Sequence, residues 1–319
     1  RQSTLKKYVI LNSKDNQYLY GRVYNDKRFP NGHLILTTRI IELNEDETMA
    51  ITENKTEYVF SRIISFKFTK NIFVPYTSFN AVFCCDEIFL KSVSYVKLLI
   101  NDNEIHMGFI DTLKSYEKNG CFFISLVSKS FTAVMLQNYL AAGLYPDISF
   151  NSLMENYISM PYVTHENNSE KSGYIYVSEN KSFWDSVCSF GYKSKKNIPY
   201  ISGTNKVNIS IPKNPEIIVL KTENITEKGR TSDYRAILSD IYMQDAAGEY
   251  GKYHLHSDKA DTLNISRRMN ISLDRQFLYS PDSALVYRMQ QYFQKEKLFY
   301  VKSAGFAKAE LYDVLQDGN

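Results

Sequence analysis

Alternating apolar and polar positions dominate the first third of the chain and predict β-strands. Within residues 58–68, Phe66 and Phe68 alternate with polar neighbours, which is the period of a strand with one buried face. Residues 73–85 predict another strand, which Pro75 confines to an edge or a bend. With further short candidates nearer the N-terminus, the pattern gives about seven or eight strands, enough to close a small barrel.

The centre of this pattern is a series of three strands followed by a helix. Strands predicted at residues 95–100, 105–113 and 121–127 are separated by turn-forming Asn, Asp and Gly residues. The third run is too apolar for a sheet that is wet on one face, so both of its faces are expected to be covered. The apolar period then becomes helical over residues 131–139, where Ser130 can cap the start.

Helical periodicity also marks the middle third of the chain. Ser182 can cap a helix whose apolar stripe contains Phe183, Trp184 and Val187. At that spacing Trp184 is either part of the core or a platform on which a ligand could stack.

Strand patterns resume from residue 217, with one short strand candidate at residues 263–265. One more helix is predicted at about residues 281–297, where Ser-Pro-Asp gives a cap and a first-turn proline. The predicted fold class is therefore mainly β (β+α). Two β-barrel domains, residues 1–130 and 213–319, flank a small α+β connecting segment of residues 131–212.

Three stretches carry a resemblance to a known family. Residues 102–111 read Asp-Asn-Glu-Ile-His-Met-Gly-Phe-Ile-Asp and precede a turn, an apolar strand and Ser-Lys-Ser-Phe. Residues 181–192 and 199–212 then give the order helix, strand, turn and strand. This order resembles phage baseplate hub proteins of the late-control-D type, over roughly the middle and last thirds of the chain. The shared motifs are structural and carry no catalytic signature.

The resemblance implies a structural role and a set of partners. Both barrels would be similar to tail tube proteins, and three chains would form a homotrimer, a pseudo-sixfold ring that joins the tail tube protein to the central spike protein among other baseplate proteins. DNA or a tape-measure protein would pass through only as cargo. The chain would assemble in the host bacterial cytoplasm and end in the baseplate of a virion or a phage-tail-like particle.

Composition and charge agree with a folded protein and limit its partners. The chain has 319 residues, of which 44% are hydrophobic and 23% charged, and its net charge is +3. That charge argues against a dedicated nucleic-acid binder. No apolar run approaches the ~18 residues that span a bilayer, so no membrane binding is expected. The 25 Tyr and 19 Phe residues reflect either coding bias or interface surface.

A search for chemistry finds no nucleotide-binding loop, nucleophile elbow or zinc-protease motif. His254 and His256 share one face of a predicted strand, and with Asp258 they are the candidates for metal ligands. A further ligand is not identifiable, and the favoured explanation is that these are polar residues at an exposed strand end. The four Cys residues have no Cys-x-x-Cys spacing and are predicted to be buried, unreactive thiols. We therefore expect no catalytic residue, no metal and no cofactor.

Three classes of function remain open from the sequence. The chain is a structural hub, a carbohydrate- or nucleic-acid-binding β protein without catalysis, or an enzyme whose constellation the sequence does not reveal. Mass in solution discriminates between them, because only a hub is required to close into a ring.

Overall fold

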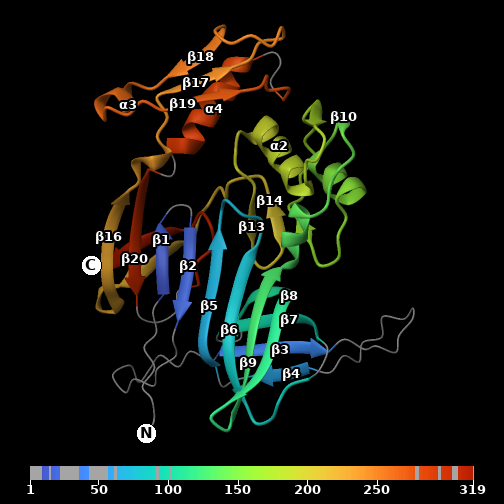
Figure 1. The fold of residues 1–319 in the computed structure, drawn as a ribbon, viewed down its shortest axis with the longest axis vertical. Helices are drawn as coiled ribbons and strands as arrows, with labels where there is room; N and C mark the ends of the chain where they lie inside the picture. Colours follow the sequence, from blue (N-terminus) through green and yellow to red (C-terminus); the bar gives the residue numbers. More distant parts are fainter. Residues whose placement is uncertain are drawn as a thin grey trace.

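The computed structural model confirms the mainly β fold class (Figure 1). It describes residues 9–13, 16–21, 36–42, 57–60, 63–90, 93–100, 103–276, 280–293, 296–303 and 308–318.

The largest sheet has eleven strands, in the order β16-β20-β1-β2-β5-β6-β9-β8-β7-β3-β4, and every neighbouring pair is antiparallel. Its strands are β1 (Val9–Ser13), β2 (Asn16–Gly21), β3 (Leu36–Glu42), β4 (Glu57–Phe60), β5 (Ile63–Asn71), β6 (Thr77–Cys85), β7 (Val93–Ile100), β8 (Asn103–Lys118), β9 (Cys121–Ser130), β16 (Ile225–Ser232) and β20 (Lys297–Ser303). Asn119 and Gly120 both have positive φ in the turn between β8 and β9, as an Asn-Gly turn requires. The sheet joins strands from both ends of the chain, because β1 pairs with β20.

The core of this sheet follows the predicted alternation. Phe66 and Phe68 of β5 are buried, and Phe68 lies opposite the buried Phe79 of β6. One face of β9 is buried and the other is only half-buried, so the expected covering of both faces is incomplete. A second sheet completes the core, with β15 (Ile217–Lys221) parallel to β21 (Val314–Gly318) and Leu220 packed into the same cluster.

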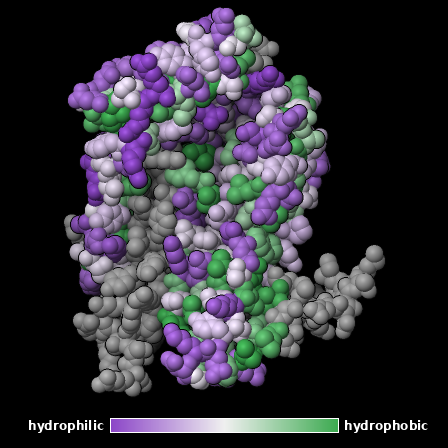
Figure 2. All heavy atoms as spheres, viewed as in Figure 1, coloured by the Kyte–Doolittle hydropathy of each residue, from purple (hydrophilic) through white to green (hydrophobic). Residues whose placement is uncertain are grey.

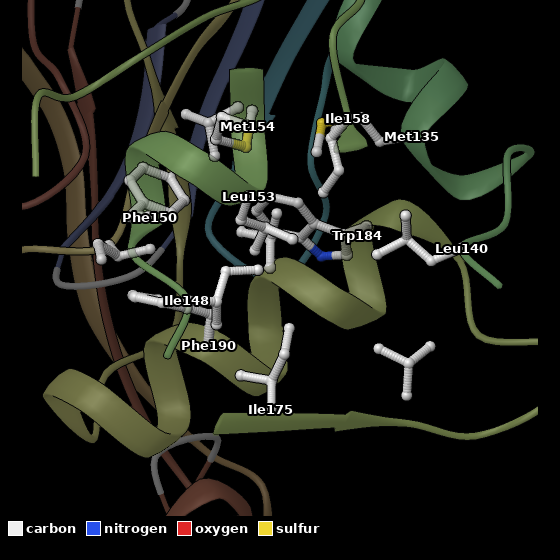
Figure 3. Packing of buried hydrophobic residues seen from close by; sticks show 14 of the residues in the cluster. Met135, Leu140, Ile148, Phe150, Leu153, Met154, Ile158, Ile175, Trp184 and Phe190 are labelled. Carbon is white, nitrogen blue, oxygen red and sulfur yellow. The ribbon is translucent and has the colours of Figure 1, made fainter. Parts of the chain in front are cut away.

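The middle segment packs around α2 (Phe183–Lys195). Ser182 caps α2 as predicted, because its hydroxyl accepts from the amide of Asp185 while the Asp185 carboxylate accepts from the amide of Ser182. Trp184 is 6% exposed and lies in the hydrophobic cluster that Figure 3 shows, so it is a core residue. The other elements are η1 (Phe131–Leu136), β10 (Gly143–Pro146), α1 (Phe150–Ser152), η2 (Leu153–Tyr157), β11 (Thr164–His165), β12 (Tyr174–Val177), β13 (Tyr200–Ser202) and β14 (Lys206–Asn208).

The helix expected over residues 131–139 is wrong in type and length. The structure has only the short 3-10 helix η1 there, and Ser130 makes no side-chain cap to it. The Ser130 hydroxyl instead accepts from the amide of Thr77 at 3.0 Å, so cross-strand bonding takes the group that a cap would use.

A small unit in the last third of the chain combines a three-stranded sheet with two helices (Figure 1). β17 (Asp240–Met243) lies between antiparallel β18 (Tyr253–His256) and parallel β19 (Arg268–Ile271). The short helix α3 (Asp258–Thr262) follows β18, and α4 (Pro281–Phe293) packs on β17 and β18. The 3-10 turns η3 (Thr222–Asn224) and η4 (Tyr234–Ala236) precede the unit.

Two predictions for this unit need correction. The strand expected at residues 263–265 is absent, because α3 runs into a turn in which Asn264 has positive φ. The predicted helix begins at Pro281 as expected, but Lys297, its expected end, begins β20. The division into domains 1–130, 131–212 and 213–319 stays a prediction.

Candidate functional site

The two predicted histidines lie side by side on β18 and meet an acidic residue of β17. Pairing of the strands places Asp240 directly opposite His256 and Tyr242 opposite His254. The Oδ1 atom of Asp240 lies 2.8 Å from Nε2 of His254 and 3.0 Å from Nδ1 of His256. Because residues two apart share one face of a strand, both imidazoles converge on one carboxylate oxygen.

Asp258, the third residue predicted from the sequence, lies at the start of α3. Asp258 could share an ion with His256 and Asp261, and all three of these residues are exposed. The ligand group that contains both histidines includes Asp240 and not Asp258. Asp240 precedes His254 by 14 positions, and no spacing rule connects them. Sequence reasoning missed Asp240 because only the register of β17 against β18 brings it to the histidines.

Other side chains hold these groups in place. The Ser239 hydroxyl donates to Oδ2 of Asp240 at 2.8 Å, and Asp261 lies 2.8 Å from Nε2 of His256. The ring of Tyr242 stacks on His254, with centroids 4.3 Å apart and planes 9° from parallel. The cluster, defined here as Asp240, His254 and His256, is therefore fixed from several sides.

Charge is unevenly distributed in this cluster. Hydrogen bonds to Asp240 and Asp261 raise the pKa of His256 to about 9, and the two histidines hold the pKa of Asp240 well below its usual range. Asp240 is nearly buried, while His254 and His256 are partly exposed to solvent. Solvent can therefore reach the imidazole side of the cluster.

A separate cleft of about 1140 Å³ lies between the middle segment and the small unit. Its lining includes Trp184 and Tyr192 of α2, Tyr287 and Arg288 of α4, and Arg275. Gln276 and Tyr176 both line the cleft, and the Gln276 side chain hydrogen-bonds the backbone amide and carbonyl of Tyr176. Figure 2 shows hydrophilic and hydrophobic residues interspersed over the viewed face, without a large patch of one kind.

Cys85 and Cys188 are poor candidates for an activated nucleophile. Burial raises the pKa of Cys188 to about 12 and also raises the pKa of Cys85, which is the direction expected from their apolar neighbours. Both are free thiols, as are Cys84 and Cys121. Cys121 is exposed, so the prediction that the thiols are buried is wrong there. Among the described residues, no helix is long and apolar enough to cross a membrane.

Comparison with known proteins finds similarity only at the level of three-dimensional structure. No family model matches the chain, and no curated protein matches it. A tail protein from Neisseria meningitidis MC58 superposes with a TM-score of 0.57 at 9% identity, covering 89% of this chain and 99% of that one. The 43 kDa tail protein of prophage MuSo2 from Shewanella oneidensis gives 0.58 at 10% identity, over 84% of this chain and 81% of that one.

The chain has the fold of phage tail proteins. The similarity to the Neisseria tail protein extends over nearly all of that protein. At this identity the likeness establishes the fold, and the role within a tail has to be argued from the chain itself.

Proposed function

We propose that this chain is a structural component of a phage tail or phage-tail-like particle, and specifically a baseplate hub. In this role three copies form a ring that joins the tail tube to the central spike. The observation that carries the proposal is the match to two tail proteins over more than four fifths of the chain, together with the hub-like order of elements in the sequence.

The large antiparallel sheet suits a ring-forming role. Strands from the two ends of the chain form one sheet, and β16 and β4 are its edge strands. A subunit of a ring needs a rigid body. It also needs two different surfaces, because one surface of each copy contacts the other surface of the next copy.

An apolar surface for such a contact lies on the second sheet. Ile217 and Val219 of β15 are 61% and 58% exposed, and Val314 of β21 is the cross-strand partner of Ile217 and is also exposed. Exposed aliphatic residues side by side on one sheet face are typical of protein contact surfaces. We assign this face to contact with the next copy in the ring.

The proposed role in a tail requires no catalysis by the chain and no cofactor. Partners would be the tail tube protein, the central spike protein and other baseplate proteins, with DNA or a tape-measure protein as passing cargo. The small net charge suits a lumen that such cargo must cross without binding.

Sedimentation velocity and native mass spectrometry test the proposal, on the chain alone and with its cognate tube and spike proteins. A trimer, alone or with a neighbour, is the expected result. A chain that stays monomeric with every tail neighbour but binds an oligosaccharide or single-stranded DNA at micromolar concentration would replace the hub with the binding-protein alternative.

A further inference from the structure

We propose that Asp240, His254 and His256 form a binding site for one divalent transition-metal ion, with zinc(II) as the best-fitting ion. This inference concerns the small unit of β17–β19, α3 and α4, and it does not depend on the role of the chain in a tail.

The three ligand atoms already lie close enough to share an ion. One atom from each residue can be chosen so that all lie within 4.8 Å of one another. Zinc bonds of roughly 2.0–2.2 Å in a tetrahedral site separate neighbouring ligand atoms by about 3.4 Å. The present separations of 2.8 and 3.0 Å from the Asp240 oxygen therefore need to open by about half an ångström, which small side-chain rotations of exposed imidazoles can supply.

The groups around the cluster orient each ligand as outer-shell groups do in metal proteins. Ser239 holds Oδ2 of Asp240 and leaves Oδ1 for the ion. Asp261 accepts from Nε2 of His256, which directs Nδ1 of the same ring towards the site. The ion would replace the Nδ1 proton that now faces Asp240, and that proton would be released to solvent. Stacking on Tyr242 fixes the ring plane of His254.

The donor set selects the class of ion. Two imidazole nitrogens and one carboxylate oxygen suit zinc and its first-row neighbours, whereas calcium and magnesium prefer oxygen ligands throughout. Three protein ligands leave a fourth position, which solvent can fill on the exposed side of His254 and His256. Arg268 approaches the cluster, with Nε 3.9 Å from Oδ2 of Asp240, but its side chain is largely exposed and can turn away.

A metal here would stabilise a small unit. The hydrophobic cluster of the unit contains few fully buried residues, among them Ile241, Met243 and Leu285. Units with small cores gain much of their stability from metals or other cross-links. An ion held by Asp240 and both histidines would join β17 to β18, next to the start of α3.

Isothermal titration of the metal-free full chain with zinc chloride tests the site. We expect one ion per chain, and a loss of affinity of at least about 100-fold in H254Q and in D240N, with a smaller loss of about 10- to 100-fold in D261N. The matched control is H165Q, because His165 also lies beside an acidic residue, Glu155, but belongs to β11 of the middle segment. H165Q is expected to bind as the unchanged chain does.

Cobalt(II) absorption and thermal unfolding complete the test. Cobalt bound by two imidazoles and a carboxylate gives ligand-field bands that H254Q should remove, while zinc should raise the melting temperature of the chain but not that of H254Q. The melting temperature without metal shows whether each variant folds. No binding by the unchanged chain, equal binding in H254Q, or dependence on Asp258 in place of Asp240 would each overturn the proposal.

Discussion

The side-chain amide of Asn205 donates a hydrogen bond of 3.0 Å to the carbonyl oxygen of Met107, although the two residues are 98 positions apart. The side-chain oxygen of Asn205 also accepts from the backbone amide of Thr132 at 3.2 Å. Asn205 is buried, so one side chain ties the loop before β14 to both β8 and η1. This contact connects the middle segment to the main sheet.

Replacing Asn205 with alanine is expected to destabilise this connection. The change leaves the Met107 carbonyl and the buried Thr132 amide without their hydrogen-bond partner. Each of these groups that water cannot reach should lower the free energy of unfolding by about 1–3 kcal/mol. Urea unfolding measures the loss. Asn156→Ala is the control, because the Asn156 amide bonds Ser152 at an exposed position and its loss should cost under about 0.5 kcal/mol. Equal effects of the two changes would contradict the structural role of Asn205.

A fully buried histidine is expected to make stability fall in acid. His106 of β8 bridges Thr77 of β6 at 2.7 Å and Ser128 of β9 at 2.8 Å. Since the Ser128 hydroxyl donates to the Phe109 carbonyl, it accepts from Nε2–H of His106, and Nδ1 accepts from Thr77. The ring is therefore neutral, and burial lowers its pKa from 6.5 to about 3.

The sign of the pH effect follows from these pKa values. Between pH 6.5 and about 3 the unfolded chain binds a proton at His106 that the folded chain excludes. Stability from this residue is thus complete above pH 6.5 and falls below it by at most about 1.4 kcal/mol per pH unit. Urea unfolding from pH 7 to pH 4 measures the slope. His106→Gln should be less stable at pH 7 and should have a shallower slope, and an unchanged slope would show that other groups cause it.

A buried lysine is expected to depend on one carboxylate. Lys70 of β5 forms an ion pair with Glu310 and donates to the carbonyl of Gly203 at 2.8 Å. Its side chain is almost fully buried, and burial lowers its pKa. Removing the acidic partner leaves a cation that water cannot solvate, which is far more costly than breaking an exposed pair.

Glu310→Gln is therefore expected to cost about 1–3 kcal/mol of unfolding free energy, less than for a fully buried pair because Glu310 itself is partly exposed. Glu227→Gln is the matched control, since Glu227 pairs with Lys302 at the surface and its loss should cost much less stability. Guanidinium unfolding compares the two variants. A loss in Glu310→Gln no larger than in Glu227→Gln would mean that Lys70 does not need its partner.

The exposed face of β15 is expected to govern assembly and not folding. Val219→Glu places a charge on an exposed apolar face, so it should weaken ring formation about tenfold or more while leaving the melting temperature nearly unchanged. Val286→Glu on α4 is the control, because Val286 is also exposed but lies away from the second sheet. Sedimentation of both variants with the tail neighbours checks the effect, and equal assembly would exclude this face from the contact.

Local sequence patterns determined the elements whose causes lie within a few residues. The alternation around Phe66 and Phe68 fixes which side of β5 is buried, and the Asn119-Gly120 pair fixes the turn after β8 through its positive φ values. Ser182 and Pro281 likewise mark the starts of α2 and α4, since capping and a first-turn proline act on the adjacent backbone. The same local signals gave the hub-like order of helices and strands, and that order predicted the tail fold.

Only the tertiary structure decided which distant residues meet. The pairing of β1 with β20, the bond from Asn205 to Met107 and the burial of His106 depend on strand register, which no local period specifies. His254 and His256 were visible as a pair because they share one strand. Asp240 joins them because β17 pairs with β18 in one register, and a shift by one residue would turn its carboxylate to the opposite face.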